Sequence, residues 1–224
     1  KARAEAEAKA RAEAEAKAKA EEEAKWVGAA AMRHTESLVV GDDPALRRDL
    51  GAMVEEVTPR GGWFSRRKEW QLLFRGSRDG MKRDEFHRRC DGKGPTVVVV
   101  RTAAGAVFGG YASDSWDSSG EHKKGASYEG SFVFGLRGME GGGGAVKLRP
   151  NLAKGRESGF VYCSSRFGPF FHHDLFLWHS RRSSKCWVNS SIYTVGKPAG
   201  TGAHFLNGGT QHFTPAEVEV FGLA

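Results

Sequence analysis

Short apolar runs separated by turn residues set the pattern of the chain between residues 70 and 111. The first run, Trp70–Phe74, predicts a strand, and Ser77–Gly80 (Ser-Arg-Asp-Gly) stops it with residues that favour turns. The run Thr96–Val100 shows no polar alternation, which predicts a strand that is covered on both faces. Gly105 then predicts a turn into a further strand, Val107–Tyr111.

A short helix is predicted between the first two of these strands. Asp79 stands where it can cap the first turn, and Gly92 is a typical C-terminal stop. Phe86 and Cys90 are one turn apart, which places both on the face toward the core.

An amphipathic helix is predicted ahead of these strands. Asp43 and Pro44 are typical of an N-cap followed by proline at the first helical position, and Thr58-Pro59 ends the helix. The apolar residues of Ala45–Val57 share one face: Leu46, Leu50, Met53, Val54 and Val57. We expect this face to pack against the sheet.

The remainder of the chain predicts more strands, joined by connections rich in serine and glycine. The candidates are Ser131–Leu136, Glu157–Cys163 and Asp174–Trp178. In the last strand Glu217 and Glu219 alternate with valines, which places both carboxylates on a solvated face. Many short strands with few helices predict an α+β fold class, a mostly antiparallel β-sandwich flanked by a few helices.

The first 25 residues follow a different pattern. Residues 3–10 and 11–18 repeat one octad of alternating alanine and charge, built from strong helix formers. Acid-before-base pairs four residues apart, from Glu5–Lys9 to Glu21–Lys25, each stabilise a helix by about 0.2–0.5 kcal/mol. We therefore expect a long, solvent-exposed charged α-helix ahead of the β-rich body.

The alanines of this helix spread over every face, so no coiled-coil seam forms. At about 1.5 Å per residue it spans on the order of 37 Å. Two interpretations stay open, a stiff solvated spacer and an arm laid along a partner. We divide the chain into residues 1–34, a helix with a linker, and residues 35–224, one folded domain.

Composition limits the class of protein. With 224 residues, 14 Phe and 6 Trp the chain can bury one substantial core, and no run approaches the roughly 18 apolar residues that span a bilayer. The chain begins at Lys1 without a signal peptide, and we interpret it as part of a longer protein. Three unpaired-looking cysteines, Cys90, Cys163 and Cys186, indicate buried thiols in a reducing compartment, the cytoplasm.

The net charge is +7, and residues 1–25 contribute nothing to it because their acids and bases balance. A basic body suits an acidic partner, such as nucleic acid, an anionic membrane or an acidic protein face, and it is equally typical of a merely soluble surface. The densest basic patch is Arg66, Arg67 and Lys68, with aromatic neighbours that include Trp70. No nucleic-acid-binding motif accompanies it, which argues against a nucleic acid partner.

Candidate chemistry is sparse. A metal set of His172, His173, His179, Cys163 and Cys186 fits no compact zinc spacing, so we expect no metal and no other cofactor. Two arginines precede Cys90 and could lower its pKa, but its apolar helix face indicates a structural thiol. A capped turn accounts for the adjacent Ser, Arg and Asp of residues 77–79, and we assign no catalytic residue.

The motifs between residues 70 and 111 resemble the TLDc domain. That family's pattern includes an apolar strand, S-R-D-G, a helix ending near Cys, G-P-T with an apolar strand, and V-F-G-G-Y, and the C-terminal Phe213–Phe221 is similar to its ending. The resemblance covers about residues 35–224, with one departure, where bulky Phe170–His173 replace small residues before Asp174. It marks these positions as structural or interaction residues: Trp70, Ser77, Arg78, Asp79, Gly80, Gly109, Gly110, Asp174 and Glu219.

The family is associated with protection from oxidative stress and with regulation of the vacuolar proton pump (V-ATPase), and it has no established catalytic centre. The resemblance therefore implies a non-catalytic domain that docks on protein partners in a large assembly, without a small-molecule substrate. The octad helix favours a second hypothesis, a structural component of a cytoskeletal or ciliary (microtubule) array. An enzyme is the third option, and no acid–base–nucleophile set supports it.

Overall fold

A computed structural model describes residues 36–41, 43–57, 70–123, 130–155, 160–172, 174–178, 186–189, 191 and 193–223. The predicted N-terminal helix and linker, residues 1–34, lie outside the described residues. So does the basic patch Arg66, Arg67 and Lys68.

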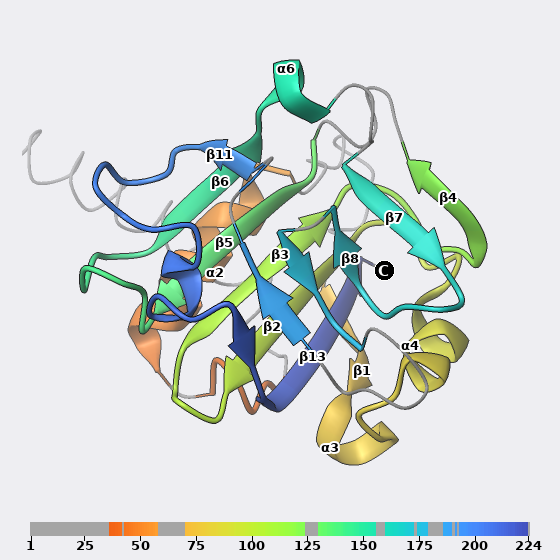
Figure 1. The fold of residues 1–224 in the computed structure, drawn as a ribbon. Helices are drawn as coiled ribbons and strands as arrows, with labels where there is room; N and C mark the ends of the chain where they lie inside the picture. The colour runs from red at the N-terminus through yellow and green to blue at the C-terminus, as the bar shows by residue number, and fades with distance from the viewer. Residues whose placement is uncertain are drawn as a thin grey trace, which may run out of the picture.

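Strands dominate the described part of the chain (Figure 1). The helical elements are α2 (Pro44–Glu55), α3 (Gly76–Asp79), α4 (Arg83–Cys90), α6 (Leu152–Gly155) and the 3₁₀ turn η1 (Phe205–Asn207). The strands are β1 (Trp70–Arg75), β2 (Thr96–Thr102), β3 (Val107–Ala112), β4 (Ser119–Lys123), β5 (Phe132–Arg137), β6 (Val146–Pro150), β7 (Val161–Ser164), β8 (Phe170–Phe171), β9 (Leu175–Phe176), β10 (Cys186–Val188), β11 (Tyr193–Val195), β12 (His212–Phe213) and β13 (Pro215–Leu223). The prediction of a mostly antiparallel α+β fold with few helices is confirmed.

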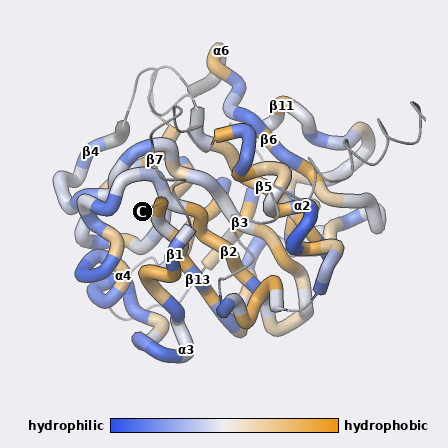
Figure 2. The backbone as a smooth tube through the Cα atoms, turned by 180° about the vertical axis from the view of Figure 1, so that it is seen from behind, coloured by the Kyte–Doolittle hydropathy of each residue, from blue (hydrophilic) through white to orange (hydrophobic). Residues whose placement is uncertain are grey.

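One seven-stranded sheet organises the molecule, in the order β1-β13-β2-β3-β5-β6-β11. Its named strand pairs are antiparallel, and the C-terminal strand β13 lies between β1 and β2. Strand β2 is buried on both faces, as its unbroken valine run predicts. Figure 2 shows the central strands as the hydrophobic centre of the chain.

The valines of β2 alternate between two apolar layers. Val97 and Val99 face one layer, together with α2 and the segment 39–40. Asp43 caps α2 by accepting from the amides of Ala45 and Leu46, and Pro44 follows it, as predicted. The fully buried Leu50 of this helix contributes about 1.5–3 kcal/mol by leaving water.

Val98 and Val100 face the second layer, which the smaller sheets supply. One of these sheets has the order β12-β10-β9-β8, and the other pairs β4 with β7. Figure 1 shows β8 on one side of the large sheet and α2 on the other. The large sheet is thus covered on both faces, by the helix and N-terminal segment on one and by short strands on the other.

Some predicted boundaries were wrong. The strand expected at Asp174–Trp178 is only Leu175–Phe176, and Trp178, beyond its end, adopts a left-handed backbone conformation with φ 56°. Within the candidate Glu157–Cys163, residues 157–159 lie outside the described part of the chain, and the observed strand is β7, Val161–Ser164. The strand expected at Ser131–Leu136 is β5, and its Phe132, Phe134 and Leu136 share one apolar layer as predicted. Among the described residues no helix combines the length and apolarity needed to cross a membrane.

Candidate functional site

The Ser-Arg-Asp-Gly segment turns the chain sharply at the end of β1. Its first residues form the single turn α3, Gly76–Asp79, directly after the extended Arg75. Gly80 follows with φ 95°, a left-handed conformation that side chains disfavour. The motif therefore fixes the direction in which the chain leaves the sheet edge and enters α4.

Asp79 is the polar centre of this turn. Its carboxylate accepts from the backbone amide of Arg75 at 2.9 Å and forms ion pairs with Arg78 at 2.8 Å and with Arg89 of α4 at 2.9 Å. The hydrogen bond from Arg78 lowers the pKa of Asp79 below its ordinary value, and the amide of Arg75 adds to that effect. The Asp79 side chain is only 2% exposed, whereas its partner Arg78 is 47% exposed and reaches the surface.

The prediction that Asp79 caps α4 was wrong. Lys82 occupies the N-cap position of that helix and makes no side-chain capping bond. Asp79 instead lies at the end of α3, and one helical turn brings its carboxylate back to the amide of Arg75, four residues earlier. Asp79 therefore stabilises α3, the turn that contains it, and not the first turn of α4.

Glu219 is completely buried, which overturns the prediction of a solvated strand face. Its carboxylate accepts from Nε of Arg75 at 2.9 Å, from Oγ of Ser37 at 2.5 Å and from the backbone amide of Leu38 at 2.9 Å. The prediction failed because β13 is an inner strand of the sheet and the segment 37–41 lies over this end of it. A buried carboxylate requires such paired donors.

Glu217 is likewise buried, at 2% exposure. Its Oε1 accepts from the backbone amides of Ser77 and Val218, both at 3.0 Å. This second carboxylate of β13 therefore holds the first residues of α3. Together Glu217, Glu219 and Asp79 bind α3, β1 and the N-terminal segment to the C-terminal strand, and we call these three residues the carboxylate cluster.

The two glycines of β3, Gly109 and Gly110, allow close packing. A Cβ atom on Gly110 would lie 2.6–2.8 Å from ring carbons of Phe171, and one on Gly109 would lie 2.7 Å from the ring of Phe134. Phe171 belongs to the smaller sheet and Phe134 to the large one. Trp70 is buried at 3% exposure, with its ring 6.3 Å from that of Tyr111.

Asp174 has a separate position, in the turn directly before β9. It is fully buried, and its carboxylate accepts from the amide of Ser191 at 2.7 Å, the hydroxyl of Ser191 at 2.5 Å and the amide of Tyr193 at 2.6 Å. The carboxylate therefore fixes the chain that enters β11. Asp174 is thus an organising residue of the loop region, where the departure Phe170–His173 precedes it.

The remaining sequence candidates do not form a metal centre among the described residues, where no group of three possible ligands lies together. His173 and His179 lie outside those residues. All three cysteines are buried. Burial raises the pKa of Cys90 far above its ordinary value and that of Cys186 to about 11, so neither thiol is poised as a nucleophile at neutral pH.

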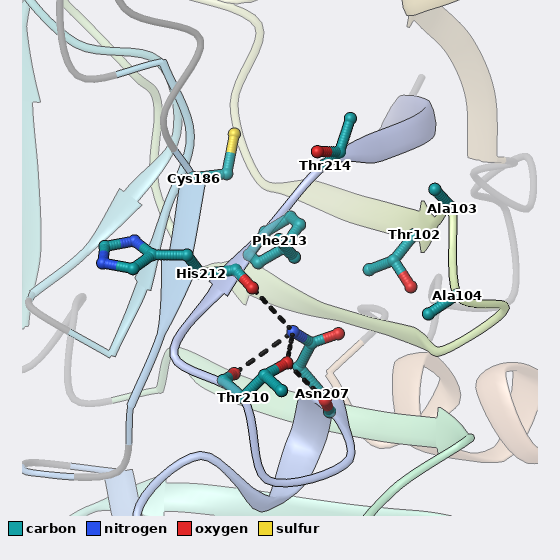
Figure 3. A pocket seen from close by; sticks show the side chains of 9 residues that line it. All are labelled: Thr102, Ala103, Ala104, Cys186, Asn207, Thr210, His212, Phe213 and Thr214. Atoms are coloured by element: carbon teal, nitrogen blue, oxygen red, sulfur yellow. Dashed lines mark hydrogen bonds between the residues drawn. The ribbon is translucent and has the colours of Figure 1, made fainter.

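An open pocket of about 480 Å³ lies between the β2–β3 turn and the loop around β12. Its lining residues are Thr102, Ala103, Ala104, Cys186, Asn207, Thr210, His212, Phe213 and Thr214 (Figure 3). Nδ2 of Asn207 donates to Oγ1 of Thr210 at 2.7 Å and to the Thr210 carbonyl at 3.1 Å. Asn207 and Thr210, two polar residues of the pocket wall, are therefore hydrogen-bonded to each other. Nothing in the sequence pattern predicted this pocket.

The carboxylate cluster is built for structure more than for chemistry. The partners that sequence reasoning missed are Ser37 and Arg75, which meet at Glu219 from positions 182 and 144 residues away in the chain. The only available signal for Arg75 was its place at the end of an apolar strand. Nothing in the sequence around Ser37 marked it as a partner of the last strand.

The chain forms an antiparallel β-rich domain whose C-terminal strand lies inside the large sheet. The Ser-Arg-Asp-Gly turn is hydrogen-bonded to that strand through Glu217. These two features define the class of protein as a β-rich domain with a motif-bearing turn. Residues 47–224 match the family model of the TLDc domain, and the chain belongs to that family. The resemblance identified from the motifs is thereby confirmed.

Two proteins with similar segments carry the name MTOR-associated protein MEAK7. The one from Danio rerio is 35% identical over 48 residues, which cover 21% of this chain and 11% of that protein. The one from Gallus gallus is 37% identical over 49 residues, which cover 22% of this chain and 10% of that protein. The matched segments span about a tenth of the length of these relatives.

Proposed function

We propose that this TLDc domain is a non-catalytic protein-interaction module that docks on a large assembly. The supporting observation is that the motif residues Asp79 and Glu219 form hydrogen bonds within the fold. The carboxylates of Asp79, Glu217 and Glu219 accept bonds from α3, Arg75 and the N-terminal segment, so these three groups are engaged in holding the fold together. Family membership favours the same role.

The partner that we propose is a protein surface of the vacuolar proton pump, as the TLDc resemblance implies, with a role in oxidative-stress protection. The relatives named MTOR-associated make an mTOR-containing assembly a further outcome for any test. Cytoplasmic localisation is part of the proposal, since three buried cysteines, an odd number, suit a reducing compartment.

We also propose that the domain begins near residue 35. The support is the contact of Ser37 and Leu38 with the buried Glu219, which makes the segment ahead of α2 part of the fold. Two truncated chains, starting at residue 35 and at residue 42, provide the test. The longer chain should unfold at the higher urea concentration, and equal midpoints would move the boundary to α2.

A second candidate function is a structural component of a cytoskeletal or ciliary assembly, held by the N-terminal helix. The octad repeat of residues 3–18 favours it, because a stiff charged arm suits a fixed place in an array. In that case the arm, rather than the domain, would carry most of the affinity.

Cross-linking and affinity purification of the full chain from native cell extract test both proposals. Pump subunits recovered with the chain lacking residues 1–34 would support the first. Tubulin or other filament proteins that disappear with that deletion would support the second. Incubation of the purified chain with a metabolite mixture tests the non-catalytic assignment. Conversion of any small molecule into a product by the chain would overturn it.

A further inference from the structure

His87 joins α4 to the turn that follows β7. Its Nδ1 lies 2.9 Å from Oδ1 of Asp91, at the C-terminal end of the same helix. Its Nε2 lies 2.7 Å from the backbone carbonyl oxygen of Phe167. The His87 side chain is 11% exposed, so water has little access to either contact.

Both ring nitrogens of His87 therefore face acceptors. A carboxylate and a carbonyl oxygen can only accept, so both bonds form together only when each ring nitrogen carries a hydrogen. That form is the imidazolium. In neutral imidazole one nitrogen has no hydrogen, and its lone pair would point at an acceptor.

The carboxylate of Asp91 and two backbone carbonyls favour the charged form of His87. Asp91 faces it from the end of α4, and Oδ2 of Asp91 also accepts from the hydroxyl of Ser118 at 2.9 Å. From the same helix, Arg83 donates to the carbonyl of Arg166 in the turn at 2.8 Å and pairs with Asp84. Burial lowers the pKa of His87, but bonds to Asp91 and to the carbonyls of Phe167 and Ser164 outweigh it, and the net direction is upward.

The turn that His87 contacts runs from Ser164 to Phe167. The amide of Phe167 donates to the carbonyl of Ser164 at 3.1 Å. The ring of Phe167 packs at 5.2 Å from Phe176 and at 5.7 Å from both Tyr162 and Phe170. This aromatic group is part of the loop region in which the chain departs from the family pattern. A change in the His87 bond therefore acts directly on that region.

We propose that His87 makes a pH-sensitive contact between α4 and the turn 164–167. As an imidazolium it binds the turn to α4, and it releases the turn when the ring loses a proton. The charged Asp91 keeps the hydrogen on Nδ1 in the neutral ring, because a charge-assisted bond is the stronger of the two. The proton is thus lost from Nε2, and the bond to Phe167 is the one that breaks. The inference is independent of the partner proposed above.

Nitrogen NMR of the His87 ring in the full chain, from about pH 5 to 9, tests the first step. We expect both ring nitrogens to be protonated at about pH 6 and the ring to titrate above the ordinary value of 6.5. A neutral ring with a single hydrogen at about pH 6 would overturn the proposal, whatever happens to the turn.

Hydrogen exchange of the amides in residues 164–168 tests the second step. After correction for intrinsic rates, opening of the turn should rise roughly tenfold across the titration of His87, the factor that corresponds to one lost hydrogen bond. His87→Gln should remove this pH dependence. The control His204→Gln should leave it in place, because Nδ1 of His204 contacts the carbonyl of Val188 and not this turn. If the turn opens equally often at about pH 5 and at about pH 9 in the unaltered chain, the proposed role of His87 is refuted.

Discussion

Arg75 and Glu219 form an ion pair at 2.9 Å in the interior of the domain, between strands that are neighbours in the sheet and 144 residues apart in the chain. Arg75 is 12% exposed and Glu219 is not exposed at all. The strand register places the two residues directly opposite each other. This pair connects the family's Ser-Arg-Asp-Gly turn to its C-terminal strand.

Replacing Glu219 with Gln should destabilise the domain by about 3–5 kcal/mol, because Arg75 is then left buried without its counter-charge. Gln retains a single oxygen, so its NH2 group would face either Nε of Arg75 and the amide of Leu38 or the hydroxyl of Ser37. Urea unfolding followed by tryptophan fluorescence measures the change. Glu121→Gln on the exposed part of β4 is the control and should change stability by less than about 0.5 kcal/mol. Equal stability of the two variants would contradict the buried pair.

Asp79→Asn should reduce the loss of stability in acid. The pKa of Asp79 is lowered by Arg78 in the folded state, so the carboxylate stabilises the fold above its unfolded pKa. That stability is lost as the pH falls through the folded pKa, below about pH 4. The variant should therefore be less stable than the unaltered chain at neutral pH and converge with it in acid. Unfolding free energies measured over this range would show parallel curves if Asp79 were unpaired.

Gly110→Ala should cost about 1–3 kcal/mol by overpacking, since the new methyl group would meet the ring of Phe171. Gly143→Ala is the matched control, because a Cβ atom there meets open space without a left-handed backbone. Thermal unfolding of both variants measures the difference. Addition of Phe171→Leu to Gly110→Ala should recover part of the loss, and strict additivity of the two changes would argue against the contact.

The three thiols should react slowly in the folded state. All are buried, and burial raises the pKa of Cys186 to about 11, so little thiolate forms near pH 7.5. Labelling with a chromogenic disulfide should then follow the rate at which the domain opens, and mild urea should accelerate it. Rapid labelling of one thiol per chain without urea would reveal an accessible site and reopen a redox role.

Local chemistry was sufficient to predict several elements. Asp43 and Pro44 start α2 because capping and a fixed proline dihedral act within one turn of the chain. The four valines of β2 predicted double-sided burial because no polar residue interrupts them. Each of these inferences depends on residues that are near neighbours.

The carboxylate cluster could not be predicted in the same way. The alternation of Glu217 and Glu219 with valine is the pattern of an edge or surface strand, and it held no information about what lies over the strand. Asp79 looked like a cap for the next helix, because the sequence shows an acid before a helix but not the path of the turn between them.

The sequence by itself determined several of the elements, the family and the buried state of the thiols, since these follow from short-range preferences and from motifs of fixed spacing. Tertiary structure alone decided that the glutamates of β13 are internal and that Ser37, Arg75 and Glu219 meet. The physical reason is that burial depends on which distant segments cover a strand, and a buried charge is tolerated only where those segments bring donors to it.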